Sequence, residues 1–430
     1  MSLMWAMIAV LMVLLLLTVP IAFCIAMAAI AGCVLFFPGT NMIPVLAQSM
    51  ATAVDNFPLL AIPYFTVMGS IMIRGGIADA LVGLAKMAVG GRTGGLGMAA
   101  VIASMFFAAI SGSGPATVAA IGGIMIPYMI AQKYKPGYSA ALLGCASTIG
   151  PVIPPSIPMI MFGVTVGCSV STLFLAGMIP GILMGVFLIV QNFFVAKKEG
   201  YGGIERKLSP SETKEAWKKG IWALFMPVIV LGTIYAGVCT PTESAVIGVA
   251  YSLIVGKFVF RKLSWENLKK SLVESGITTG TILVLMGGAT TLARLLTLGG
   301  VPNLILENIL AMKLSPILVM VIVNAVLLIS GMFLDAISGI IIWAPLFVPI
   351  LVAMGYDIIH VGVIFAINVS IGLVTPPLGA DLYIGQKVAK CELQECLRPA
   401  INMLIILLLL LAILIIFPDI TMLLPRLLGR

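Results

Sequence analysis

Charged residues are scarce in this sequence. Only 9% of the 430 residues are Asp, Glu, Lys or Arg, whereas 61% are hydrophobic, and the mean hydropathy is +1.19. A water-soluble domain carries about 25% charged residues, so the composition excludes a soluble enzyme, a nucleic-acid-binding protein and a disordered chain. The net charge of +8 does not point to a nucleic-acid partner, because the basic residues lie in the segments between apolar runs.

Several motifs of catalysis are missing as well. The sequence has no Gly-x-x-x-x-Gly-Lys-Ser/Thr phosphate loop, and its seven cysteines show no metal-ligand spacing. The Ala-Ile-Ser-Gly segments at Ser111 and Ser338 faintly suggest the nucleophile turn of an intramembrane serine protease. Such an enzyme needs a histidine base, and the sole histidine, His360, falls in a predicted outer loop, where we expect it to be structural. We therefore expect neither an ATP-driven pump nor an enzyme.

Long apolar runs are what the sequence has in abundance. Residues 3–37 and 401–417 are nearly unbroken apolar segments. A helical span needs about 20 such residues, whereas the strands of a membrane barrel alternate apolar and polar residues over about ten positions. The sequence therefore predicts an all-α polytopic protein in the lipid bilayer, with about ten spans.

The chain also carries an internal repeat. Pro154-Pro155 and Pro376-Pro377 lie 222 residues apart, at breaks in similar apolar segments. We expect a first repeat at 1–195, a cytoplasmic linker at 196–220 and a second repeat at 221–430. Each repeat should hold an arm (37–57 and 257–275), a re-entrant hairpin (94–130 and 316–352) and a discontinuous helix (138–166 and 361–386).

Two hydrophilic segments connect these elements. Residues 74–93, which contain Lys86, are expected to form a loop. Within the linker, Ser209 would cap a short helix and Gly220 would end it.

Charge indicates that the two repeats are inverted. The arm at 37–57 has no Lys or Arg, whereas its counterpart at 257–275 has five. Since cytoplasmic loops are rich in Lys and Arg, the equivalent arms prefer opposite sides of the membrane. A periplasmic N-terminus leaves only Lys313, Arg426 and Arg430 outside. Inverted repeats with paired broken helices are typical of secondary transporters that bind substrate at the bilayer midplane.

The breaks carry the candidate chemistry. Freed carbonyl and hydroxyl oxygens suit Na⁺, and the N-termini of half-helices suit a carboxylate. The alternative is that Gly and Pro only kink the helices for packing. The four breaks are expected at 111–115, 150–156, 333–338 and 372–379.

Asp335 is the sharpest single candidate. A carboxylate at mid-bilayer costs about 2.5–3.5 kcal/mol, which predicts a cation as its partner unless it reaches water. Ser113 and Thr375 offer hydroxyls to a site, or bond back to their own helices. Arg294 lies inside a predicted span and either faces an anionic substrate or snorkels to the outer surface. Glu243 is expected to tie helix ends or contact a partner subunit.

These motifs resemble the large membrane subunit of tripartite ATP-independent periplasmic (TRAP) transporters. The resemblance implies an elevator-type importer of an organic acid, commonly a C4-dicarboxylate, sialic acid or another sugar acid, driven by a Na⁺ gradient. It implies two partners, a small four-helix membrane subunit and a periplasmic substrate-binding protein, in the bacterial inner membrane. The resembling segments are Ser111 to Thr117, Gly150 to Ser156, Gly331 to Asp335 and Thr375 to Gly379.

The resemblance also implies site residues, with two or more Na⁺ sites and a substrate held between the hairpin tips. One Na⁺ would bind where 111–114 meets 150–155, and another where Asp335 meets 375–377. The Na⁺ candidates are Ser111, Gly112, Ser113, Gly114, Gly150, Pro154, Asp335, Ala336, Thr375 and Pro376. The candidates for binding substrate are Ser113, Pro115, Ser156, Ser338, Arg294 and Gly379.

Two other transport functions compete with this one. A stand-alone divalent-anion/Na⁺ symporter shares the repeat plan and needs neither a binding protein nor a small subunit. The hydrophilic linker and the motifs favour the tripartite transporter, and transport by this chain alone in liposomes would favour the symporter. A channel is the third function, but hairpins entering from both sides suit alternating access better.

Overall fold

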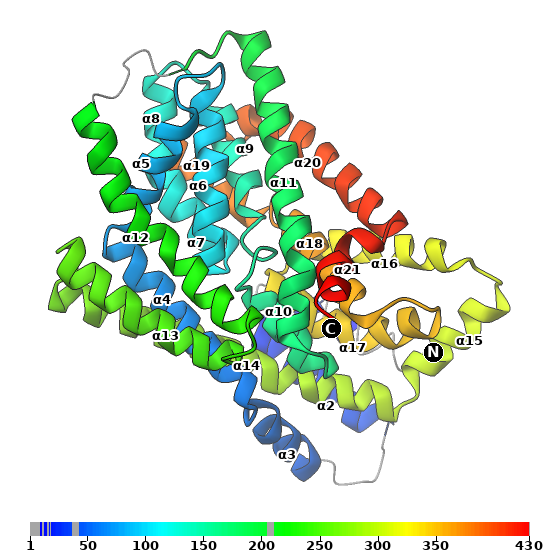
Figure 1. The fold of residues 1–430 in the computed structure, drawn as a ribbon. Coiled ribbons are helices and arrows are strands. Elements are labelled where there is room, and N and C mark those ends of the chain that lie inside the picture. Colours follow the sequence, from blue (N-terminus) through cyan, green and yellow to red (C-terminus); the bar gives the residue numbers. More distant parts are fainter. Residues whose placement is uncertain are drawn as a thin grey trace.

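The computed structural model describes residues 9–10, 13–14, 17, 19–36, 43–203 and 210–429. Among these residues the chain folds into helices and contains no strand (Figure 1). The predicted all-α class is therefore confirmed. Eight helices in the described part of the chain are long and apolar enough to cross a membrane.

The first half of the chain ends in a helix of 30 residues, and shorter helices precede it. In chain order its elements are α2 (Ile21–Phe36), α3 (Ile43–Val54), η1 (Phe57–Leu60), α4 (Ala61–Arg74), α5 (Ile77–Val89), α6 (Gly95–Ser111), α7 (Gly114–Thr117), η2 (Val118–Gly122), α8 (Gly123–Ala131), α9 (Pro136–Ser147), α10 (Ile157–Val166) and α11 (Val170–Glu199).

The second half follows a similar order, with α14 in the place of α3 and α4 together. Its elements are α12 (Pro210–Tyr235), α13 (Pro241–Ile254), η3 (Val255–Val259), α14 (Trp265–Leu298), α15 (Val301–Ala311), α16 (Pro316–Gly331), α17 (Ala336–Ala353), α18 (Ile358–Gly372), α19 (Ala380–Ala389), α20 (Leu393–Ile416) and α21 (Asp419–Leu427).

All four expected interruptions are present. The first hairpin breaks between α6 and α7, where Gly112 has a left-handed φ of +59°. The second hairpin breaks between α16 and α17, and the two discontinuous helices break between α9 and α10 and between α18 and α19. The peptide bonds Pro154–Pro155 and Pro376–Pro377 are both cis. The eight candidate spans include the second limb of each hairpin, Gly114–Ala131 and Ala336–Ala353, whereas α6, α10, α16 and α18 are shorter apolar helices.

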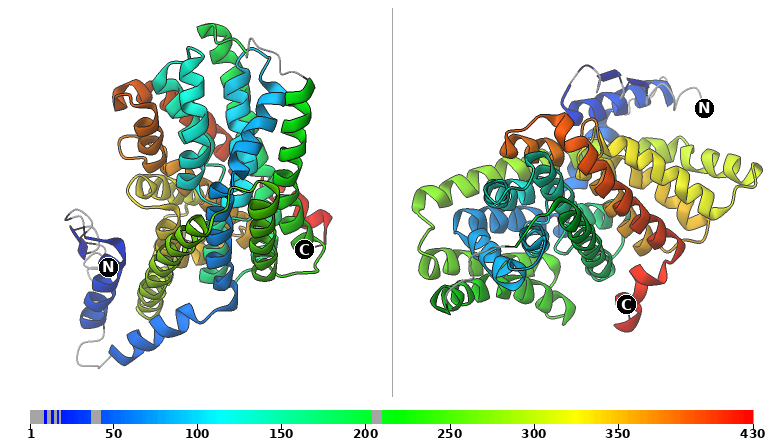
Figure 2. Two further views of the ribbon diagram at one scale, coloured as in Figure 1. Left: turned by 90° about the vertical axis from the view of Figure 1, so that its left-hand side faces the viewer. Right: turned by 90° about the horizontal axis from the view of Figure 1, so that it is seen from above.

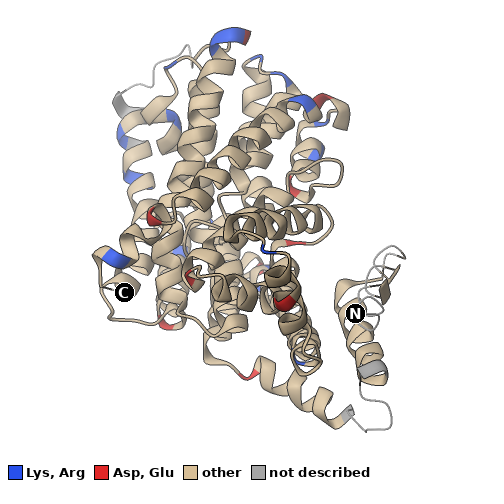
Figure 3. Cartoon of the chain, turned by 90° about the vertical axis from the view of Figure 1, so that its right-hand side faces the viewer, with Lys and Arg blue, Asp and Glu red and all other residues tan. Residues whose placement is uncertain are grey.

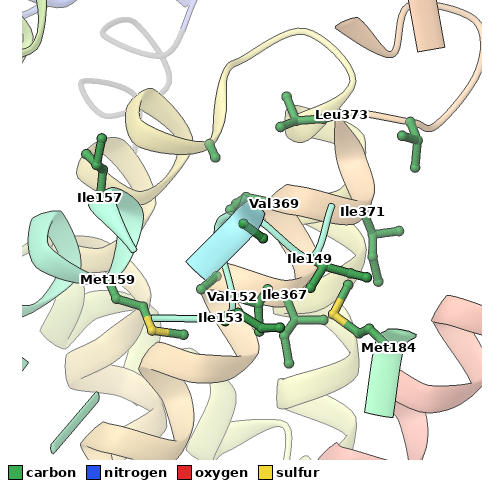
Figure 4. Close-up of a cluster of buried hydrophobic side chains, with 14 of the residues drawn as sticks. Ile149, Val152, Ile153, Ile157, Met159, Met184, Ile367, Val369, Ile371 and Leu373 are labelled. Atoms are coloured by element: carbon green, nitrogen blue, oxygen red, sulfur yellow. The ribbon is translucent and has the colours of Figure 1, made fainter. Parts of the chain in front are cut away.

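The interruption between α9 and α10 is buried, and its residues pack against α18 (Figure 4), whereas Phe333, Asp335 and Leu378 of other interruptions are exposed. Lipid cannot satisfy the backbone groups that a break frees, so this burial allows the break between α9 and α10 to persist. The residues of this cluster include Ile149, Val152 and Ile153 from the interruption between α9 and α10, Ile367, Val369 and Ile371 from α18, and Met184 from α11.

The two arms differ from each other. Residues 43–54 of the first arm form α3, and its residues 37–42 lie outside the described ranges. The second arm was expected to be separate from the next span, but 265–298 is one continuous helix, α14. Ser264 caps its start by accepting a hydrogen bond from the Asn267 amide at 3.1 Å, and no proline interrupts it afterwards.

The segment expected as a loop at 74–93 contains a helix instead. α5 packs against α6 and α12 through its apolar face. The Lys86 ammonium lies 3.3 Å from the centroid of the Tyr128 ring, which lets a basic residue stand against the protein body.

Gly220 does not end a linker helix, because α12 runs through it to Tyr235. A Cβ at Gly220 would lie 2.0 Å from Cγ of Leu84, so the glycine permits close packing of α12 on α5. Ser209, the expected cap, lies outside the described residues.

The body of the molecule is a bundle of helices, with α2 at its edge against α14 (Figure 2). Lys and Arg gather toward one end of this bundle, and most of the remaining surface carries few charges (Figure 3). This distribution is typical of a multi-pass membrane protein, in which Lys and Arg collect in the loops on one side.

Candidate functional site

The four interruptions meet α4 and α14 around one cavity of about 340 Å³. Ligand pockets for small molecules have volumes of about 300–1,000 Å³. The hairpin tips contribute Ser111 to Ala116 and Asp335 to Ile337. The discontinuous helices contribute Pro151, Ile157, Pro158, Leu373 and Ala380, and the remaining lining residues are Phe65, Thr66, Gly69, Ser70 and Ile73 of α4 and Glu274, Ser275, Thr278 and Ile282 of α14.

The predicted site residues divide into two groups. Those at the hairpin tips line the cavity: Ser111, Gly112, Ser113, Gly114, Pro115, Asp335 and Ala336. The others do not line it: Gly150, Pro154, Ser156, Ser338, Thr375, Pro376, Gly379 and Arg294. The tips therefore contribute more of the cavity lining than the discontinuous helices do.

At the first junction, which is residues 111–114 with 150–155, two backbones approach closely. A Cβ on Gly150 would lie 2.9 Å from the Ser113 carbonyl oxygen. Oγ of Ser111 lies 3.2 Å from Oγ1 of Thr117, which donates to the Ser113 carbonyl at 2.7 Å. Backbone and hydroxyl oxygens thus converge where the first hairpin meets the first discontinuous helix.

At the second junction, which is residues 331–335 with 372–377, the closest approach involves two glycines. A Cβ on Gly372 would lie 2.6 Å from Cα of Gly331. Thr375 bonds back to its own helix, since its hydroxyl donates to the Ile371 carbonyl at 2.9 Å. The hairpin and the helix therefore meet a few residues before Asp335 and Thr375.

Asp335 is exposed to the cavity and caps α17. Its carboxylate accepts hydrogen bonds from the Ile337 amide at 3.1 Å, from the Ser338 amide at 3.3 Å and from the Ser338 hydroxyl. Ser156 caps α10 in the same way, accepting from the Met159 amide at 3.2 Å. The hydroxyls of Ser156 and Ser338 are thus used within their own breaks.

Arg294 and Glu243 hold helices in place. The Arg294 guanidinium donates to Oγ of Ser49 at 2.8 Å, which links α14 to α3 away from the cavity. Glu243 forms a capping box with Thr240 at the start of α13, so it stabilises a helix end.

His360 is not in an outer loop, as the sequence suggested. Asp357 caps α18 by accepting from the Ile359 amide at 2.7 Å, so the helix already includes His360. The imidazole is buried, and its Nδ1 lies 2.8 Å from Oγ1 of Thr421 in α21. It serves to attach α21 and lies away from the cavity.

The sequence does not single out one further acidic residue near the cavity. Asp381, near the start of α19, is 0% exposed. Its Oδ2 accepts from the Ser147 hydroxyl at 2.6 Å, and its Oδ1 has no hydrogen-bond partner in the described part of the chain. A Cβ on Gly114 would lie 2.4 Å from Oδ2, which places this carboxylate at the first junction. The only sequence signal was a second acidic residue close to a break.

Comparison with known proteins explains this arrangement. Residues 8–420 match the family described as "Tripartite ATP-independent periplasmic transporter, DctM component". The chain belongs to this family. As a DctM-family large permease it is a transport protein, as the resemblance implied.

Relatives of this DctM-family chain are named for different substrates. It is 39% identical over 384 residues to the C4-dicarboxylate TRAP transporter large permease protein DctM of Pseudomonas aeruginosa, covering 89% of the chain and 90% of that protein. It is 33% identical over 408 residues to the sialic acid permease SiaM of Vibrio cholerae, covering 95% of each. It is 38% identical over 404 residues to the isethionate permease DctMQ of Oleidesulfovibrio alaskensis, covering 94% of the chain but only 63% of that longer protein.

Solved structures of other transporters share the fold of this DctM-family chain. The YdaH transporter of Alcanivorax borkumensis matches with a TM-score of 0.64 over 87% of the chain and 88% of YdaH. MtrF of Neisseria gonorrhoeae matches with a TM-score of 0.54 over 86% of the chain and 83% of MtrF. Both are 12% identical in sequence, so they show the fold alone.

The TRAP permease cavity receives several helix N-termini. Residues at the starts of α7, α10, α17 and α19 are all in its lining. Ser156 and Asp335 cap α10 and α17 with their side chains, but α7 and α19 have no side-chain cap. At the start of α19 the Asp381 amide already donates to the Leu373 carbonyl at 3.0 Å, so what these two helix starts offer a ligand is mainly the positive end of the helix dipole.

Proposed function

We propose that this chain is the large membrane subunit of a Na⁺-coupled TRAP transporter that imports an organic acid by an elevator mechanism. The observation that carries the proposal is the cavity in which both hairpin tips, both discontinuous helices, α4 and α14 meet. Such a meeting of broken helices from two repeats is where secondary transporters hold substrate and coupling ion.

An acidic substrate is supported by the polarity of the lining. No Lys or Arg is among the lining residues, but helix N-termini and hydroxyls are. The helix N-terminus carries partial positive charge and free N–H donors, which suit a carboxylate or sulfonate. Relatives named for isethionate, C4-dicarboxylate and sialic acid support an organic acid of one of these kinds.

Coupling to Na⁺ is supported by the two junctions. Each brings the backbone of a hairpin against the backbone of a discontinuous helix, so carbonyl oxygens lie close together. Hard cations bind such oxygens. The charged side chains in the lining, Glu274 and Asp335, are both acidic, so an anion enters more readily when Na⁺ binds beside it, and we propose two or more Na⁺ as co-transported substrates.

The elevator motion is supported by the division of the cavity wall. α4 and α14 are tied to each other by the Arg74–Glu274 ion pair, and Oγ1 of Thr66 lies 3.5 Å from Oγ1 of Thr279. We propose that these two helices belong to a static scaffold, and that the arms at 37–57 and 257–275 brace the domain that moves. The hairpins and discontinuous helices, which form the opposite wall, would then move together with their bound substrate.

The remaining assignments follow from the family. We propose a small four-helix membrane subunit and a periplasmic substrate-binding protein as partners, in the bacterial inner membrane with the N-terminus periplasmic. A membrane partner is supported by the relative named DctMQ, of which this chain covers only 63%.

Uptake by purified protein in liposomes tests this function. The chain is reconstituted with and without a small subunit and candidate binding proteins, under an inward Na⁺ gradient and under a choline gradient of equal strength. We expect accumulation of an organic acid only with the binding protein and Na⁺. Uptake by the chain alone would instead establish the stand-alone symporter, and uptake without Na⁺ would refute sodium coupling.

A further inference from the structure

The packing described above gives Asp381 too few partners. The Ser147 hydroxyl that donates to its Oδ2 also lies 2.5 Å from the Gly144 carbonyl. A hydroxyl has one hydrogen to donate, so the carboxylate shares even this bond. Oδ1 has none, and Asp381 takes part in no ion pair within the described part of the chain.

A buried carboxylate in this situation is expensive. The desolvation free energy of an ionised carboxylate is far larger than the stabilisation from one shared hydrogen bond, so buried charges are paired or bind cations. The residue lies in a discontinuous helix at membrane depth, where acidic residues mark ion pathways or pair with each other. Its burial therefore calls for a partner that the protein side chains do not supply.

Two backbone carbonyl oxygens lie near Gly114 and Gly150, and Gly114 itself contacts Asp381. A Cβ on Gly114 would lie 2.4 Å from Oδ2 of Asp381 and 3.4 Å from the Ser147 carbonyl oxygen. A Cβ on Gly150 would lie 3.1 Å from that same Ser147 oxygen and 2.9 Å from the Ser113 oxygen. Because neither glycine has a side chain, one carboxylate and two backbone carbonyls approach the same short stretch of backbone, and hard cations bind such groups.

We propose that Asp381 is a direct carboxylate ligand of Na⁺ at the first junction. This inference rests on the sodium coupling of the proposed function and adds a ligand from the second half of the chain to a site otherwise built by the first. The carboxylate neutralises the bound cation, and the missing side chain at Gly114 lets the carboxylate lie against the backbone of the first hairpin. Na⁺ binding then fastens α19 to α7 and α9 before the substrate is carried.

A simpler role would be that Asp381 only offsets the dipole of the helical run that starts at Gly114. The two roles differ in Na⁺ dependence. A dipole partner affects stability equally with and without Na⁺, whereas a ligand changes the Na⁺ concentration at which the protein responds.

The test measures that concentration in the purified full chain. The melting temperature is followed as NaCl replaces choline chloride at constant ionic strength, and uptake in liposomes is followed over the same range. For Asp381→Asn we expect the half-saturating Na⁺ concentration to rise by about tenfold or more in both measurements, since truncating a buried charge pair has large effects. For Asp419→Asn, an exposed carboxylate in α21, we expect no change.

A second pair of variants covers the case in which Asp381→Asn does not fold. Ser147→Ala removes the hydroxyl that orients the carboxylate, and Ser139→Ala removes a buried hydroxyl of the same helix that bonds only to the Lys135 carbonyl. We expect Ser147→Ala to raise the half-saturating Na⁺ concentration severalfold and Ser139→Ala to leave it unchanged.

The outcomes distinguish failure of the Asp381 ligand from failure of sodium coupling. If the unmodified chain responds to Na⁺ and the Asp381 and Ser147 variants respond at the same concentration, Asp381 is not a ligand and sodium coupling stands. If the unmodified chain shows no Na⁺ response in either measurement, sodium coupling fails and the inference fails with it.

Discussion

The two junctions use matching elements but treat their carboxylates differently. At the first, Asp381 is buried and one of its oxygens has no partner in the described chain. At the second, Asp335 is exposed and its oxygens accept hydrogen bonds from the first turn of α17. A capped carboxylate in contact with water needs no cation, whereas a buried one does. By our proposal, an acidic residue near a helix break binds a cation when it is buried without another partner.

The largest expected effect on stability comes from adding a methyl group where two backbones approach closely. Gly150→Ala and Gly372→Ala place a methyl group within 2.9 Å of the Ser113 backbone and 2.6 Å of the Gly331 backbone. Because backbone must shift to admit it, we expect each to lower the free energy of unfolding by about 1–3 kcal/mol. Gly372→Ala should be the more severe. Thermal unfolding of the purified variants checks this order.

The matched control for these variants is Gly83→Ala in α5, where a Cβ would meet no atom within 4 Å. It should be neutral or stabilising, by about 0.5–1 kcal/mol, because alanine favours helix more than glycine does. If Gly372→Ala proved as stable as this control, the two helices would not touch at the second junction.

The next effect concerns a contact at the second hairpin. The Asn368 amide donates to Oδ1 of Asn324 at 2.6 Å and to its carbonyl at 2.9 Å, which ties α18 to α16. Asn368→Leu leaves buried acceptors without a donor, and we expect a loss of about 1–3 kcal/mol in unfolding free energy. The double variant Asn324→Leu/Asn368→Leu should lose less than the two single losses combined, as a double-mutant cycle measures. Strict additivity would show that the two side chains do not interact.

The sequence predicted the breaks but not the surroundings of each side chain. Gly and Pro interrupt long apolar runs, and this local signal places the ends of α6, α9, α16 and α18. Burial depends on contacts between distant segments: Asp381 is enclosed because α19 packs on α9. Asp335, equally close to a break, faces the cavity instead. No local pattern distinguishes these two residues.

The contacts that hold α5 and α12 were harder to predict than the breaks. α5 was expected to be a loop because Lys86 stands in it, yet the Tyr128 ring accommodates that charge. Gly220 was expected to end a helix, yet it only makes room for Leu84. In both positions a partner from another part of the chain overrides the local preference.

Substitutions at Asp335 should have a moderate effect on stability, and they test the contrast between the carboxylates of Asp335 and Asp381. Asn caps helices about as well as Asp, whereas Ala does not, and losing a cap costs about 0.5–2 kcal/mol. We therefore expect Asp335→Ala to lower the free energy of unfolding by about 1 kcal/mol and Asp335→Asn to preserve it. The half-saturating Na⁺ concentration should stay within twofold of the unmodified protein in Asp335→Asn, measured by uptake. A tenfold rise there would make Asp335 a second carboxylate ligand and remove the contrast between the junctions.

The smallest expected effect lies outside both junctions and gives the baseline. Arg294 donates to Ser49 from an exposed position on α14, and neither residue lines the cavity. We expect Arg294→Gln to lower the free energy of unfolding by about 0.5 kcal/mol, at the lower end for one hydrogen bond, because water replaces it readily. Ser49→Ala should cost as much, and the two together no more than either. Since the guanidinium is remote from the ligand, the substrate concentration that half-saturates uptake should not change. A large rise in that concentration for Arg294→Gln, but not for Ser49→Ala, would mean that the substrate anion reaches the arginine and that the binding site extends toward α3.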